Sequence, residues 1–137
     1  MFHTKEEIYM LLIGVKDENA WLISRWNLTY RVGWNHICKA VHSVYDYYQG
    51  VEILVDNKCV EVANKEDILN LGEARTLTIR GGSTIVKVPI MITFYNQTNV
   101  VDINVAKATE EFKKAEYESF NKSLCQYLDS IELAMYR

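Results

Sequence analysis

The sequence TIVKVPIMITFYNQTNVVDINV, residues 84–105, decides the fold, because its apolar side chains recur at every second position. This is the period of a β-strand, in which successive side chains point to opposite faces of a sheet. A shift of one residue would put five apolar side chains into water, so the register is firmly set. We expect two antiparallel strands, Thr84–Tyr95 and Val100–Val105, joined by a turn at residues 96–98, in a sheet with one buried face and one wetter face. The five side chains of the first strand that define the buried face are Val86, Val88, Ile90, Ile92 and Phe94.

Two further strands are predicted upstream as a hairpin. Val51–Val55 and Cys59–Val62 are rich in β-branched residues, and they flank Asp56-Asn57-Lys58, residue types that favour tight turns. Asn64 follows at the position of a helix cap, and we expect one short helical segment from there to Leu71.

A third upstream strand is expected at Thr76–Arg80. Gly81 and Gly82 follow it, and we interpret them as a tight turn that needs positive φ. Pro89 has no N–H to donate to a neighbouring strand, so we expect it at a sheet edge or a bulge.

The first block of the chain, Thr4 to Gln49, reads as helical. Thr4 and Glu7 have the spacing of a capping box at the start of a first helix. A short second helical segment is expected over Trp21–Trp26. Thr29 is interpreted as the cap of a stronger third helix, and Gly50 as its end. The apolar stripe of that third helix comprises Trp34, Ile37, Cys38, Val41, Val44, Tyr45 and Tyr48.

The last thirty residues, 106–136, contain neither Gly nor Pro and carry apolar residues at helical spacing. One straight helix of this length would extend about 45 Å, whereas strands of five residues form a sheet only about 17–20 Å across. We therefore expect an overhang, with residues 124–136 lacking an obvious partner within the chain. The side chains predicted to form an interface are Tyr117, Phe120, Leu124, Tyr127, Leu128, Ile131 and Met135.

Together these elements predict a single α+β domain over residues 1–137, with an antiparallel sheet of about five strands covered by N-terminal helices and a long C-terminal helix. The order is helix, helix, two strands, helix, three strands, helix. From Thr29 onward this order resembles the roadblock or longin-like arrangement, and residues 4–105 resemble the NTF2-like cone. Both are analogies of fold and carry no functional weight.

Composition narrows the class of protein. At 49% hydrophobic and 24% charged residues, the chain is typical of a globular protein, and no apolar run approaches the length of a membrane span. Three cysteines without a CxxC pair fit a reducing compartment, so we expect a soluble, cytoplasmic protein. The net charge of −3 is spread evenly along the chain, which argues against binding to nucleic acid or to an anionic membrane.

No motif for catalysis, a cofactor or a metal rises above background. Cys38, His42 and Asp46 share one helix face at intervals of four, but positions eight apart are about 12 Å apart and cannot readily share one ion. We expect a buried thiol beside a His–Asp pair, with neither metal nor cofactor. Enzyme activity is not indicated by the sequence.

Two functional hypotheses remain open. In the first, the chain is an accessory protein of the immunity, secretion-chaperone or phage type that binds another protein, as a homodimer, through the last helix and the aromatic segment between Trp21 and Tyr48. In the second, it is an NTF2-like small-molecule-binding domain or enzyme. That alternative requires a closed pocket that contains Trp34 or Tyr45 beside a polar group such as His42 or Asp46.

Overall fold

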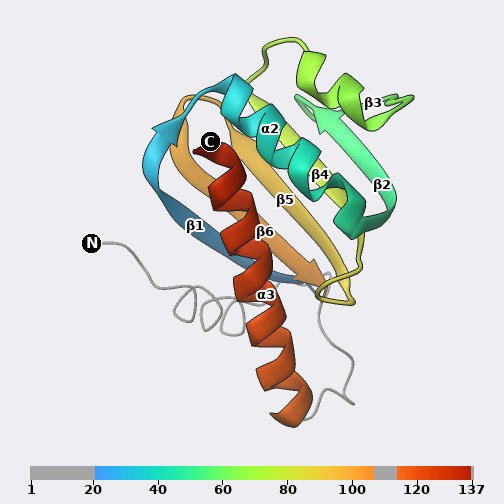
Figure 1. The fold of residues 1–137 in the computed structure, drawn as a ribbon, viewed down its shortest axis with the longest axis vertical. Coiled ribbons are helices and arrows are strands. Elements are labelled where there is room, and N and C mark those ends of the chain that lie inside the picture. Colours follow the sequence, from blue (N-terminus) through green and yellow to red (C-terminus); the bar gives the residue numbers. More distant parts are fainter. Residues whose placement is uncertain (1–20, 107–113, 137) are drawn as a thin grey trace.

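The computed structural model describes residues 21–106 and 114–136, apart from the side chains of residues 21–24, 114–118 and 121. The first helix predicted from Thr4 and Glu7 lies outside the described residues. The described chain forms one six-stranded, fully antiparallel sheet in the order β1-β6-β5-β4-β2-β3 (Figure 1). In sequence order the strands are β1 (Trp21–Val32), β2 (Tyr48–Val55), β3 (Lys58–Val60), β4 (Thr76–Ser83), β5 (Pro89–Tyr95) and β6 (Thr98–Ala106).

Two helices, α2 (Trp34–Val44) and α3 (Lys114–Met135), lie on the same face of this sheet and pack against each other (Figure 1). Two 3-10 segments, η1 (Tyr45–Tyr47) and η2 (Lys65–Asn70), connect the strands around them. The α+β class, the antiparallel sheet and the C-terminal helix are therefore confirmed, whereas the number of strands and the order of the elements differ from the prediction.

The core lies between the helices and the central strands. Residues paired across β4, β5 and β6 are apolar at each level on this face, as in the row Ile79, Ile92 and Ile103, all of which are fully buried. Ile90, Ile92 and Phe94 are three of the five alternating positions that the sequence assigned to a buried face, because only that register removes their side chains from water. The other two, Val86 and Val88, precede the strand, because β5 begins at Pro89 and not at Thr84.

The opposite face of the sheet is polar, as the alternation predicted. Arg25 donates to Asp102 across β1 and β6 at 2.7 Å, and the Thr78 and Thr93 hydroxyls lie 3.0 Å apart across β4 and β5. A further ion pair joins Arg80 to Glu52 at 2.6 Å. These groups satisfy one another across the strands, so the face is wet without carrying unpaired charges at these positions.

Two local predictions are confirmed. Asp56 and Asn57 both have positive φ, 49° and 67°, which is the backbone of a type I′ turn between β2 and β3. Asn64 caps η2 in a capping box, accepting from Glu66 N, while the carboxylate of Asp67 accepts from Asn64 N. The two motifs specify their structure through local hydrogen bonds and backbone preferences alone.

The predicted helix over Trp21–Trp26 is wrong, because that segment begins the edge strand β1. Thr29 therefore lies within a strand, and α2 begins instead after Gly33, its extended N-cap residue. Tertiary pairing of β1 with β6 decides the structure here, because a short apolar run fits both periods.

The end of α2 also differs from the prediction. The helix stops at Val44, η1 follows, and Tyr48 already belongs to β2. Gly50 does have positive φ, 61°, but it lies in β2 where the pairing with β4 shifts between Gln49 and Glu52. The glycine serves a bulge in a strand, not the end of a helix.

The predicted turn at Gly81 and Gly82 is wrong, since both residues lie inside β4. The chain turns after Ser83, whose hydroxyl accepts hydrogen bonds from the backbone N–H groups of Ile85 and Val86. Pro89 is the first residue of β5, a central strand, so it lies neither at an edge nor at a bulge. A strand's first residue tolerates proline because a missing N–H there costs little.

The overhang of the last helix is present at the opposite end from the one expected. The first turns of α3 extend beyond the sheet, and its C-terminal turns lie over it (Figure 1). Leu124 and Met135, within the segment expected to lack a partner, have no exposed surface, whereas its last residue, Tyr136, is 38% exposed.

Candidate interaction surface

The seven side chains predicted to form an interface are mostly inside the chain's own core. Phe120 is 8% exposed, and the side chain of Tyr117 lies outside the described part. The remaining five, Leu124, Tyr127, Leu128, Ile131 and Met135, are fully buried. Tyr127 lies against Tyr47 and Tyr48, with ring centroids 6.0 and 6.1 Å apart. The six described side chains of this stripe are covered by the chain's own core and leave little surface for a partner.

In the described part of the chain, the side chains suggested for a ligand pocket lie at two places, with Trp34 apart from His42 and Asp46. Trp34 donates from its indole nitrogen to Leu71 O at 3.0 Å and borders an open depression of about 440 Å³. That depression is otherwise lined by Gly33, Asn35, His36, Leu71, Glu73 and Gln97, so it includes none of the other three.

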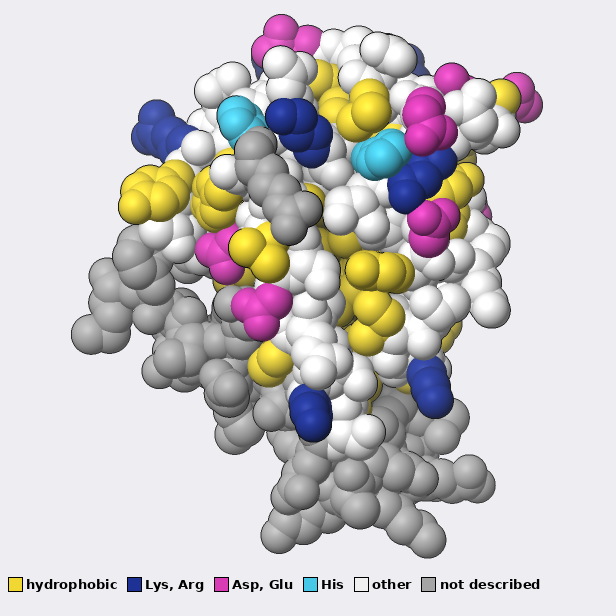
Figure 2. Space-filling model, viewed as in Figure 1, with side chains coloured by type: hydrophobic (Ala, Val, Ile, Leu, Met, Phe, Trp, Pro, Cys, Tyr) yellow, Lys and Arg dark blue, Asp and Glu magenta, His cyan; other side chains and the backbone are white. Residues whose placement is uncertain are grey.

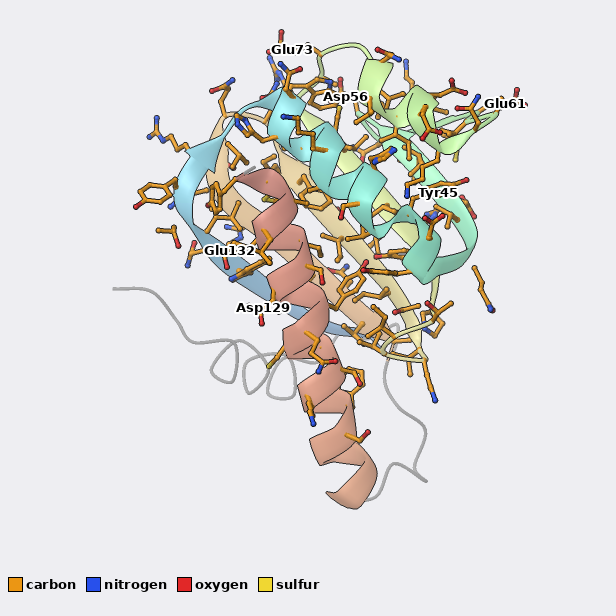
Figure 3. The ribbon with its side chains drawn as sticks, in the orientation of Figure 1. Tyr45, Asp56, Glu61, Glu73, Asp129 and Glu132 are labelled. Carbon is orange, nitrogen blue, oxygen red and sulfur yellow. The ribbon has the colours of Figure 1, made fainter. Side chains whose placement is uncertain are left out.

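His42 and Asp46 instead face η2. His42 Nε2 lies 3.5 Å from Glu66 Oε1, and Lys65 Nζ lies 2.7 Å from Asp46 Oδ2. Tyr45, half-buried between them, is on the β2 side of α2 (Figure 3). These contacts join α2 and η1 to the neighbouring segment η2.

The exposed large apolar side chains of the described surface are not those predicted for an interface or a pocket. Only four are exposed in the part of the chain that the structure describes: Tyr30 (68%), Leu133 (60%), Leu69 (42%) and Tyr136 (38%). Three of these four come from β1 and the last turn of α3, and yellow side chains are visible over these elements in Figure 2. We name Tyr30, Leu133 and Tyr136 the β1–α3 corner.

Two members of the corner, Tyr30 and Tyr136, are in direct contact. The rings of Tyr30 and Tyr136 meet edge to face, with centroids 5.7 Å apart. The Tyr136 hydroxyl accepts from Tyr30 N at 3.0 Å and donates to Tyr30 O at 3.1 Å. Beside them, Thr29 Oγ1 donates to Glu132 Oε1 at 3.3 Å. The two tyrosines are therefore presented in a fixed arrangement, which lowers the entropy lost when a partner binds.

Charged groups surround this apolar centre. Arg31 is exposed on β1, and the carboxylates of Asp129 and Glu132 lie on the β1 side of α3 (Figure 3). Burial raises the pKa of the Tyr136 phenol above its ordinary value, and the nearby Glu132 carboxylate adds to this effect. The phenol therefore stays neutral at physiological pH and can both donate and accept.

None of the three corner residues is among the predicted interface or pocket side chains, although Tyr30 lies in the aromatic segment that the sequence suggested as a binding surface. With Thr29 as a helix cap, Tyr30 is predicted at the start of a helix, whereas the structure exposes it on the edge strand β1. Leu133 has a weak signal, because it lies two positions after Ile131 and thus off the apolar stripe of α3. A large apolar residue on the otherwise polar side of a helix is the feature that could have identified it.

Other chemistry finds little support in the described residues. Within residues 21–106 and 114–136, no three His, Cys, Asp or Glu side chains are grouped so that they could hold a metal ion. Burial raises the pKa of the Cys38 thiol to about 11, so this cysteine is unreactive near neutral pH. Among the described helices, none is both long enough and apolar enough to cross a membrane.

Comparisons with known proteins add no relative. No protein-family model matches the chain, and neither the curated proteins nor the solved structures contain a match. The surface itself is therefore the basis for a functional proposal.

Proposed function

We propose that this chain is a small accessory protein that acts by binding another protein through the β1–α3 corner. The observation that supports the proposal is the direct contact of two exposed aromatic side chains, Tyr30 and Tyr136, with exposed Leu133 three residues before Tyr136 in the chain. Tyrosines held rigidly at a surface are typical anchors of protein interfaces, because they bury a large area for few rotatable bonds. The charged groups around them resemble the polar rim of such an interface.

Three side chains are the centre of an interface and not its whole area. A stable complex buries about 800 Å² on each partner, so neighbouring parts of β1 and α3 must contribute. The corner would supply most of the binding energy, and the surrounding residues would exclude water from it.

The proposal is tested by capture of partners from extract of the source cells, with matched variants. The double variant Tyr30→Asp, Leu133→Asp puts charge into the corner. Leu69→Asp changes the remaining exposed apolar side chain, which lies on η2, and serves as the control. We expect partners bound by wild type and by Leu69→Asp to be absent with the double variant. Equal capture by all three proteins would contradict the proposal.

A second copy of the chain is one partner that this surface can take. The mass of the purified protein in solution decides this case, because the monomer is 15.9 kDa. If the wild type is a dimer through the corner, the double variant should be monomeric at the same concentration. A dimer that persists in the double variant would place the contact between copies elsewhere.

A further inference from the structure

The edge strand β1 contains a large irregularity at Tyr30. Asn27 pairs with Val100 of β6, and the next paired residue of β1 is Val32, opposite Thr98. Four residues of β1, 28–31, therefore stand opposite the single residue Asn99. Such a bulge interrupts the ladder of backbone hydrogen bonds and turns part of the strand away from its neighbour.

The Tyr136 hydroxyl satisfies the backbone at this interruption. One oxygen accepts from Tyr30 N at 3.0 Å and donates to Tyr30 O at 3.1 Å. In an antiparallel sheet, a hydrogen-bonded partner residue makes the same two bonds with the residue opposite. The phenol thus satisfies both backbone groups of Tyr30, as a paired residue of a strand would.

Tyr30 lies on an edge strand, where unpaired backbone groups can pair with another chain. In the described part of the chain, β1 pairs only with β6, so its other side is an edge of the sheet. An edge offers N–H and C=O groups to any extended chain that approaches, and proteins cover or interrupt their edges to prevent this. The opposite edge strand, β3, has only three residues, whereas β1 has twelve.

We infer that Tyr136 is an edge guard: its hydroxyl closes β1 at Tyr30, and its loss opens this edge to pairing with β1 of a second copy of the chain. A second copy is the occupant because β1 is the longer edge and can pair with itself in antiparallel fashion about a two-fold axis. This inference does not depend on the proposed binding of a partner, since it concerns the backbone of Tyr30 and not the exposed rings.

The guard is separable from packing by a conservative change. Tyr136→Phe keeps the ring that meets Tyr30 edge to face and removes both hydrogen bonds. Tyr95→Phe is the matched control, because its hydroxyl donates at 2.6 Å to the Asp102 carboxylate and contacts no backbone group. Each variant therefore loses one phenol hydroxyl, but only one of them loses the backbone partner of β1.

Hydrogen exchange of the Tyr30 amide and the mass in solution at rising concentration provide the test. In Tyr136→Phe we expect the Tyr30 amide to exchange about tenfold faster and the average mass to rise above that of wild type. Tyr95→Phe should match wild type in both measurements. An unchanged Tyr30 amide in Tyr136→Phe would overturn the inference. Faster exchange without a rise in mass would also overturn it, because the opened edge would then recruit no strand.

Discussion

Two phenol hydroxyls in the core, those of Tyr48 and Tyr127, are buried and interact with each other, but neither makes a hydrogen bond of good geometry among the described residues. Their rings lie 6.1 Å apart between β2 and α3. Burial raises the pKa of each phenol above its ordinary value, because a phenolate would have to leave water. A buried hydroxyl without a good hydrogen bond loses its hydration and is not compensated, so these two hydroxyls are a weak point in the stability of the core.

This weak point predicts a loss of stability in alkali. The folded-state pKa of both phenols is raised, so their contribution to stability is complete below the unfolded pKa of about 10 and is lost as the pH rises above it. Tyr127→Phe should change the free energy of unfolding by less than about 1 kcal/mol at pH 8. At pH 11 the variant should keep about 1.4 kcal/mol of unfolding free energy that the wild type loses, because the Tyr127 phenol ionises in the unfolded wild-type chain.

Urea unfolding at pH 8 and pH 11 measures both values. Cys38, whose pKa is also raised, lowers the stability of both proteins alike and leaves the difference between them intact. Parallel loss of stability in wild type and variant would show that the Tyr127 phenol does ionise inside the fold.

At the scale of elements, close contact between strands explains a glycine that the sequence suggested was a turn. A Cβ on Gly81 would lie 2.9 Å from Gln49 O and 3.1 Å from the Tyr48 ring. On Gly82 it would meet nothing closer than Gln49 O at 3.8 Å. Gly81 is thus required where β2 bulges toward β4, whereas Gly82 is not.

The two glycines therefore form a matched pair. Gly81→Ala should lower the free energy of unfolding by about 1–3 kcal/mol, because backbone and ring must move apart. Gly82→Ala should be neutral or stabilising by up to about 1 kcal/mol, because alanine restricts the unfolded chain. Thermal unfolding of both variants checks this, and similar melting temperatures would contradict the assigned role of Gly81.

The strands and helices also differ in how well the sequence predicts them. The β2–β3 hairpin and the cap of η2 follow from neighbouring residues, and both were predicted. β1 was not, although residues 25–32 alternate between polar and apolar, because the preceding run Trp21–Ile23 fits a helix equally well. Only its pairing with β6, more than seventy residues later, settles the choice.

For the whole molecule, the sequence predicted the α+β layers and the wet and dry faces of the sheet, but not which side of α3 is free. An apolar stripe shows that a helix must be covered, not by what. In this fold α2 and the sheet cover the stripe, and the corner residues Tyr30 and Leu133 come from elements that meet only after folding. Such a site is invisible to any argument made from one segment.

This division of α3 predicts that stability and binding depend on different residues of the same helix. Ile131 is fully buried and Leu133, two residues later, is 60% exposed. Ile131→Ala should lower the free energy of unfolding by about 2–5 kcal/mol, since it leaves a cavity in the core. Leu133→Ala should change it by less than about 0.5 kcal/mol. Urea unfolding measures the two values, and comparable losses would show that the corner is part of the core. With the folded fraction held equal, partner capture should then fall for Leu133→Ala and not for Ile131→Ala, because only the leucine reaches the surface.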